Sequence, residues 1–298
     1  MLRNATCFAI LALVVVPLPA SAQISLAWKF REGESLLIEN VEKTRQVLTL
    51  KKNGKRKEEI HKSGSTVTTR SRFTVKQKTA KETVLTIKIE DIATRSTAAE
   101  GGKDLDKDVA GKMKGAVFIV TLDPSYKITK LEGFEELIKK IAGGNEEIEK
   151  LVRARMTEET LKKSLEEPYQ FLPGKPVAKG DSWKQNAVVP LGLFGSFKVI
   201  KTFTYKGKEA AGELIAFTSA MTYSPPTGEG GLLKIVKADL KGEDGAGTFL
   251  FDNDKGRLVR GDNHVAIRGS LVVEIMEELQ PIDLEVEVTN SIRVLTKD

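Results

Sequence analysis

The sequence predicts a mainly β protein: a large curved antiparallel sheet or open barrel, with a helical insert covering one side. Three observations lead to this fold class. Apolar and polar residues alternate over many long stretches, as they do in strands with one buried and one wet face. One central region, residues 133–167, changes to the period of amphipathic helices. The only cysteine is Cys7, so disulfides contribute nothing to a mature chain that lacks it, and a hydrophobic core must stabilise the fold.

The N-terminal 22 residues have the three parts of a secretory signal. Arg3 supplies a positive charge, residues 7–16 form a short apolar core, and small residues precede the expected cleavage point after Ala22. The apolar run is shorter than the roughly 20 residues that a membrane span requires. We therefore expect export through a cleavable signal peptide to the periplasm or the medium, and no transmembrane segment in the mature chain.

Residues 23–132 are predicted to form a first β unit. Residues 35–51 and 65–78 contain neither proline nor glycine, so extended strands of roughly 40 to 50 Å are possible. Such long strands twist, and they tend to close on themselves or to wrap around something. Residues 101–115, rich in Gly, Lys and Asp, predict a mobile loop. Other strands are expected at 26–30, 85–89, 116–122 and 126–131.

Residues 133–175 are predicted to be a helical insert with a connector. Phe134, Leu137, Ile138 and Ile141 have the i, i+3, i+4, i+7 spacing of one helix face, which ends at a Gly-Gly pair. Two further helix starts follow, because Asn145 and Thr157 are both suitable N-cap residues, and Pro168 stops the last helix.

Residues 176–298 predict a second β unit that forms one cooperative domain with the first. Each half begins with a tryptophan-bearing strand, at Trp28 and Trp183, and each contains an apolar strand that ends in an aspartate and turns back. These parallels favour an internal duplication. The expected strands are 183–189, 196–205, 213–223, 232–240, 247–252, 257–259, 264–268, 271–277 and 284–294.

Motifs for a metal, a cofactor or a catalytic nucleophile are missing from the sequence. Asp104, Asp106 and Asp108 alternate like the first ligands of an EF-hand, but Val109 stands where that loop needs glycine. No Gly-x-Ser-x-Gly elbow or glycine-rich phosphate loop occurs. We therefore expect no cofactor and no catalytic site, although 41 acidic residues leave a hydrolase with a carboxylate pair open.

The charge of the chain is modest and mixed. Loss of Arg3 with the signal leaves 46 basic against 41 acidic residues, a net of +5, and only 6% of residues are aromatic. This argues against a nucleic-acid-binding protein, which needs clustered charge and stacking rings. The densest basic run flanks an Asn-Gly hairpin signal and is either a solvated tip or a contact for an anionic envelope polymer. It comprises Lys51, Lys52, Lys55, Arg56 and Lys57.

Large aromatic residues on inward-facing positions are the candidate ligand-lining residues. Core packing explains them as well; the functional alternative is a partly open interior, with the helices as a plug or lid over an apolar ligand. The set is Trp28, Phe30, Trp183, Phe197, Phe203, Phe217, Phe249 and Phe251.

Several short motifs resemble an uncharacterised family of exported bacterial proteins, a domain of unknown function. They are Trp28-Lys29-Phe30, Thr121-Leu122-Asp123-Pro124, Gly180-Asp181-Ser182-Trp183, Tyr205-Lys206-Gly207 and Phe251-Asp252. The resemblance implies a common architecture and no known activity. A looser likeness is to periplasmic lipoprotein-carrier proteins, in which a curved antiparallel sheet closed by helices holds acyl chains.

The sequence therefore favours a non-catalytic envelope protein that binds or carries a lipid or another apolar small molecule. Two alternatives remain: an interaction or scaffold module that contacts an anionic polymer or a partner protein, and the carboxylate hydrolase.

Overall fold

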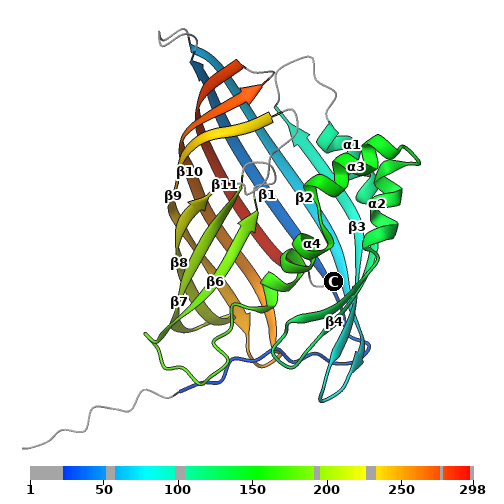
Figure 1. Ribbon diagram of the computed structural model, residues 1–298. Coiled ribbons are helices and arrows are strands. Elements are labelled where there is room, and N and C mark those ends of the chain that lie inside the picture. Colours follow the sequence, from blue (N-terminus) through cyan, green and yellow to red (C-terminus); the bar gives the residue numbers. More distant parts are fainter. Residues whose placement is uncertain are drawn as a thin grey trace, which may run out of the picture.

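The computed structural model describes residues 23–51, 58–97, 105–190, 195–225, 233–275 and 278–295. Within these ranges, eleven strands form one sheet in the order β5-β4-β3-β2-β1-β11-β10-β9-β8-β7-β6 (Figure 1). The strands are β1 (Ser35–Lys51), β2 (Glu58–Lys78), β3 (Thr83–Ser96), β4 (Val117–Leu122), β5 (Ile128–Glu132), β6 (Ser182–Pro190), β7 (Ser196–Glu209), β8 (Gly212–Ser224), β9 (Leu233–Asp252), β10 (Arg257–Ile275) and β11 (Glu278–Leu295). The helices are α1 (Leu105–Met113), α2 (Phe134–Ala142), α3 (Glu146–Arg155), α4 (Glu158–Glu166) and the 3-10 helix η1 (Glu167–Tyr169).

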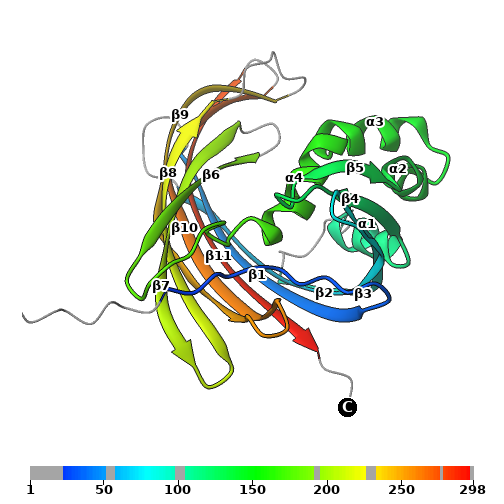
Figure 2. The ribbon, with the colours of Figure 1, turned by 90° about the horizontal axis from the view of Figure 1, so that it is seen from below.

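The sheet curls strongly but does not close. Successive strands are neighbours, and β1 pairs with β11, so only the pairing between β5 and β6 is missing and these two strands are the edges. Because every pairing is antiparallel, the order makes β5 and β6 run in the same direction, and such strands need a long crossover connection. Helices α2 to α4 lie in that connection and cover one side of the curved sheet (Figure 2). The predicted fold class is confirmed.

The helices α2, α3 and α4 start where the sequence predicts, whereas Pro168 lies inside η1, which continues to Tyr169. Asn145 caps α3 by accepting hydrogen bonds from the backbone N–H groups of Glu147 and Ile148, at 2.9 and 3.1 Å. Thr157 caps α4 in a capping box with Thr160. The predicted apolar face of α2 is buried. Local spacing and capping chemistry were therefore sufficient to locate these helices.

Three sequence expectations about elements are wrong. Residues 105–113 form α1 rather than loop, because Val109 and Ala110 pack one helix face towards β3. Residues 26–30 form no strand: the β-bridge between Ile24 and Val177 lies before them, and the Lys29 N–H donates to the Gly256 carbonyl at 3.0 Å. The five short strands expected between 232 and 277 are the two long strands β9 and β10, whose pairing continues through three register shifts.

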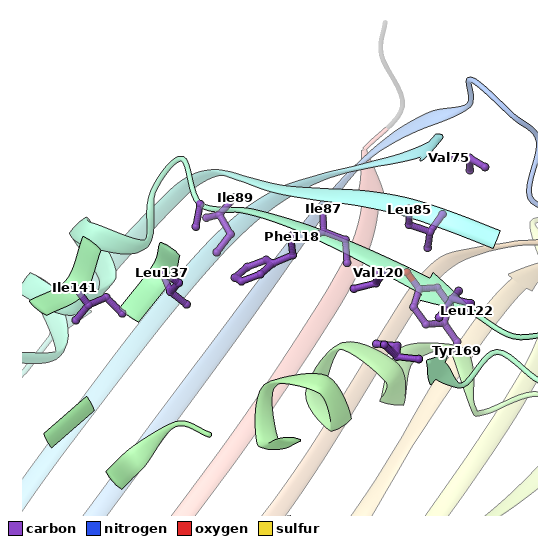
Figure 3. Packing of buried hydrophobic residues seen from close by; sticks show 12 residues of the cluster. Val75, Leu85, Ile87, Ile89, Phe118, Val120, Leu122, Leu137, Ile141 and Tyr169 are labelled. Carbon is purple, nitrogen blue, oxygen red and sulfur yellow. The ribbon is translucent and has the colours of Figure 1, made fainter. Parts of the chain in front are cut away.

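Three buried clusters form the core. The first packs β3, β4 and β5 against the helices, with Phe118, Leu137 and Ile141 among its members (Figure 3). The second is aromatic and joins β6 to β9 with the N-terminal segment. The third, around Phe197 and Val273, is built from strand residues of β6 to β11. None of the helices in the described ranges has the length and apolar character for a membrane crossing.

Candidate functional site

The concave face of four central strands is the candidate site. Strands β2, β1, β11 and β10 pair without any register shift, so residues opposite each other share one face. Phe73 and Ile292 lie on the same face as the clusters that meet the helices, which identifies this face as the concave one. It carries the even-numbered residues of 36–50 and 282–294 and the odd-numbered residues of 61–73 and 261–273.

Charged side chains are segregated between the two faces of these stretches. On the concave face, the ionisable residues are Glu42 and His61. All lysines and arginines of the same four stretches lie on the convex face, where several form ion pairs, such as Arg70 with Glu39 at 2.9 Å. These convex residues are Lys43, Arg45, Lys62, Arg70, Arg72, Arg268 and Arg293.

The concave face also carries aliphatic residues that no element covers fully. Leu48, Val265, Val286 and Val288 are half-buried, and they belong to none of the three clusters formed by the described residues. By contrast, apolar residues on β3 and β4 are buried under the helices. The helices therefore cover one side of the curved sheet. They leave Leu48, Val265, Val286 and Val288 as an apolar strip on the C-terminal part of β1 and on β10 and β11.

A mainly polar row of residues borders that strip. Asn263, Asn290, Glu42, Val67 and Thr94 are successive cross-strand partners on β10, β11, β1, β2 and β3. Direct neighbours in such a row have Cβ atoms about 4.5 to 5.5 Å apart. The Glu42 side chain reaches solvent, yet the surrounding strands displace much of the water near its carboxylate, which raises the pKa of Glu42 above its ordinary value.

Glu42 should reduce stability at neutral pH. A raised pKa in the folded chain means that the ionised carboxylate is disfavoured there, so this penalty is fully present above the folded pKa and disappears as the pH falls below the ordinary value of 4.5. We predict that Glu42→Gln raises the melting temperature at pH 7 and that the gain shrinks towards pH 4. Thermal unfolding followed by circular dichroism measures it. Glu285→Gln, on the convex face of β11, is the control, and an equal gain there would contradict the prediction.

Seven of the eight aromatic residues predicted to line a ligand site meet in one network of ring contacts. Trp28 contacts Phe30 and Phe251, with ring centroids 6.0 and 5.2 Å apart. Stacked and tilted ring contacts link the others through β6 to β9, for example Trp183 with Phe203 at 5.7 Å. The members are Trp28, Phe30, Trp183, Phe203, Phe217, Phe249 and Phe251. The eighth, Phe197, lies in the third cluster beside Tyr223.

Two aromatic residues that the sequence reading missed hold this network together. Phe171 stacks on Phe249 with ring centroids 4.5 Å apart, and Tyr169 contacts the edge of Trp28 at 5.6 Å. Their backbone carbonyls accept the indole N–H groups of Trp183 and Trp28 at 3.0 and 3.1 Å. Tyr169 is the last residue of η1 and Phe171 lies two residues after it, so their aromatic character was the one available signal. A ligand-lining role for the network stays a prediction.

Glycines allow these rings to lie against neighbouring strands. A Cβ at Gly247 would lie 2.6 Å from the Phe217 ring and 2.4 Å from the Asp262 carbonyl. Because the carbonyl belongs to the backbone and cannot move cheaply, we predict that Gly247→Ala destabilises the fold by about 1 to 3 kcal/mol. The control is Gly111→Ala on α1, where nothing lies within 4 Å and a gain of up to about 1 kcal/mol is expected. Urea unfolding of both variants tests this, and equal midpoints would contradict it.

A buried polar pair lies beside this network. The Tyr205 hydroxyl donates to the Glu213 carboxylate at 2.5 Å, and Glu213 is only 4% exposed. Burial, together with this hydrogen bond, raises the pKa of Tyr205 to about 12. The phenol therefore stays protonated at physiological pH and satisfies the buried carboxylate.

The remaining sequence candidates carry structural roles or lie outside the described residues. Lys51 pairs with Asp283 at 2.7 Å, whereas Lys52, Lys55, Arg56 and Lys57 fall in the undescribed range 52–57. The turn after β9 anchors the N-terminal segment: Asn253 donates to the Ser25 carbonyl and accepts from the Ala27 N–H. Among the described residues, no three His, Cys, Asp or Glu side chains gather as metal ligands.

These features define a curved antiparallel sheet protein with helices over one side and an amphiphilic concave face. The chain belongs to a family of unknown function, DUF6263, whose sequence profile matches residues 69–257. This confirms the resemblance to an uncharacterised family. No curated protein matches the chain.

Three solved structures show distant likenesses. Lipovitellin, in a structure described as "Lipid-protein interactions in lipovitellin", has 8% identity and a TM-score of 0.49; the match covers 90% of this chain and 26% of that one. An outer membrane channel from Pseudomonas putida F1 has 13% identity and a TM-score of 0.23, over 94% and 100%. A DUF1329 family protein from Desulfovibrio piger has 11% identity and a TM-score of 0.14, over 85% of each chain. The chain thus spans about a quarter of the lipovitellin chain, and with TM-scores this low none of the likenesses bears on function.

Proposed function

We propose that the protein binds an apolar small molecule or lipid on the concave face of its sheet and carries it within the cell envelope. The observation that carries this proposal is the strip of half-buried aliphatic residues on β10, β11 and β1, on a face from which lysine and arginine are excluded. Apolar surface gains roughly 25 cal/mol for each Å² removed from water, so a bound hydrocarbon chain would stabilise this strip.

The strip has the dimensions of a lipid chain. On the concave side of β11, the strip residues Val288 and Val286 continue into Leu284 and Ile282, which are half-buried and pack in part against the third cluster. At about 3.4 Å per residue, they span roughly 20 Å. Val265 and Ile267 on β10 lie opposite Val288 and Val286, which widens the strip to two strands. A single extended acyl chain can therefore lie along it.

The helices provide a partial cover. Helix α4 has no buried residue, although its Leu161 and Leu165 pack in part against the first cluster. Because α4 is held by few buried contacts, it can shift at low cost to admit a ligand. The envelope location rests on the secretory signal pattern of residues 1–22, which fall outside the described residues.

Native mass spectrometry of the protein purified from its exporting host tests the proposal. We expect a stoichiometric adduct that is removed by solvent extraction, together with a mature mass that begins at Gln23. Mass spectrometry of the extract then identifies the ligand. A mass that corresponds to the bare chain under gentle conditions, combined with no binding of added dodecyl amphiphiles, would overturn the carrier function.

A further inference from the structure

We propose that the concave face selects amphiphiles with an uncharged head group that donates hydrogen bonds, and that the row around Glu42 holds this head. This inference rests on the proposed function and adds the class of ligand. The polar row borders the apolar strip, because Asn290 and Val288 are successive concave residues of β11. A molecule whose chain lies on the strip therefore places its polar end at the row.

The row offers acceptors and lacks cations. Glu42 stands between Asn290 and Val67, with Asn263 on the far side of Asn290. Burial raises the pKa of Glu42, and no described residue forms an ion pair or a hydrogen bond with its carboxylate. Within the four stretches that define the concave face, the only other ionisable side chain is His61, which lies opposite Leu48, three rows from Glu42. An anionic head would meet Glu42 without any compensating cation.

The polarity of this patch is not explained by hydrogen bonds within the sheet. The Asn40 Oδ1 and Thr94 Oγ1 atoms are buried and have no hydrogen-bond partner among the described residues. Asn40 is the concave residue before Glu42 on β1, and Thr94 ends the row on β3. Buried polar atoms without a hydrogen-bond partner reduce the stability of the fold. They are expected at functional sites, where ligand binding rather than stability determines which residues are present.

A cation on the concave side of the neighbouring strand β7 is already paired. Lys201 on β7 pairs with Glu167 of η1 and lies over the Phe217 ring, 5.6 Å from its centroid. It is therefore unavailable to an anionic head. The three asparagines and Thr94 outnumber the single carboxylate, so most partners for a head group are neutral, which favours hydroxyl or amide donors over an ammonium group.

Isothermal titration with four dodecyl compounds tests the inference: monolauroylglycerol, methyl laurate, laurate and dodecylamine, each below its critical micelle concentration. Monolauroylglycerol should bind at least about tenfold more tightly than methyl laurate, which has no donor, and than laurate, which is anionic. Asn290→Leu should remove most of the advantage over methyl laurate. Glu42→Gln should strengthen laurate binding, because it removes the repulsion and keeps an acceptor. Lys43→Gln, the next residue on the convex face, is the control and should change none of these ratios.

The possible outcomes separate the two levels of the proposal. If none of the four compounds binds to the wild type or to any variant, the proposed function fails. If all bind equally, or if laurate or dodecylamine binds most tightly, the carrier function survives and the head-group inference is overturned. Thermal unfolding of each variant checks that its fold is retained.

Discussion

Replacing Trp28 by alanine should lower the free energy of unfolding by about 3 to 5 kcal/mol. The indole contacts Phe30, Tyr169, Phe171 and Phe251, with ring centroids between 5.2 and 6.0 Å away. Its N–H donates to the Tyr169 carbonyl at 3.1 Å. The substitution therefore leaves a cavity between three segments and deprives a carbonyl of its donor.

Two further variants separate the contributions to this effect. Trp28→Phe keeps an aromatic ring and loses the hydrogen bond, so its cost should be about 1 to 2 kcal/mol. Leu151→Ala on α3 is the control, because that side chain is 60% exposed and its truncation should cost less than about 0.5 kcal/mol. Urea unfolding followed by far-ultraviolet circular dichroism measures all three. A loss below 1 kcal/mol for Trp28→Ala would show that the N-terminal segment is not part of the core.

Much of the fold could be predicted because its signals are local. The stretch 35–51 has no proline or glycine and is β1 with the same bounds, and the caps at Asn145 and Thr157 start α3 and α4. The long strands β9 and β10 were divided in the prediction at gaps that contain Gly242, Gly245 and Gly261. In the structure these glycines continue the strands and make room for side chains of the neighbouring strands.

The residues of the concave face could not be predicted from the sequence, because they depend on which strands are neighbours in the sheet. Glu42 and Asn290 are at opposite ends of the chain, and only the pairing of β1 with β11 makes them adjacent. Alternation on each strand alone assigns Asn40, Glu42 and Thr44 to a polar face, which the usual rule would place towards solvent. The curl of the sheet turns that face inward. The aromatic network was easier to foresee, because large rings are rarely exposed.

A lysine in the middle of the apolar strip should abolish ligand binding while the fold remains. Val286 is half-buried on β11, opposite Gln46 of β1 and Ile267 of β10. In the free protein, the long lysine side chain of Val286→Lys can extend its ammonium group to water on the open side of the face. A bound hydrocarbon chain would cover that group, and an ammonium without a partner is costly to bury. We expect monolauroylglycerol to bind about 100-fold more weakly, which corresponds to about 2.8 kcal/mol.

Thr289→Lys provides the matched control, because Thr289 is exposed on the convex face of the same strand. It adds the same charge three residues away and should leave the dissociation constant within about twofold of wild type, since convex side chains do not meet the ligand. Isothermal titration of both variants decides between the faces, and circular dichroism confirms that each is folded. Equal weakening would mean that net charge governs binding, whereas loss in Thr289→Lys alone would move the site to the convex face. Retention of tight binding by folded Val286→Lys would exclude the strip as the ligand site, because no arrangement of a chain along β11 avoids the side chain at position 286.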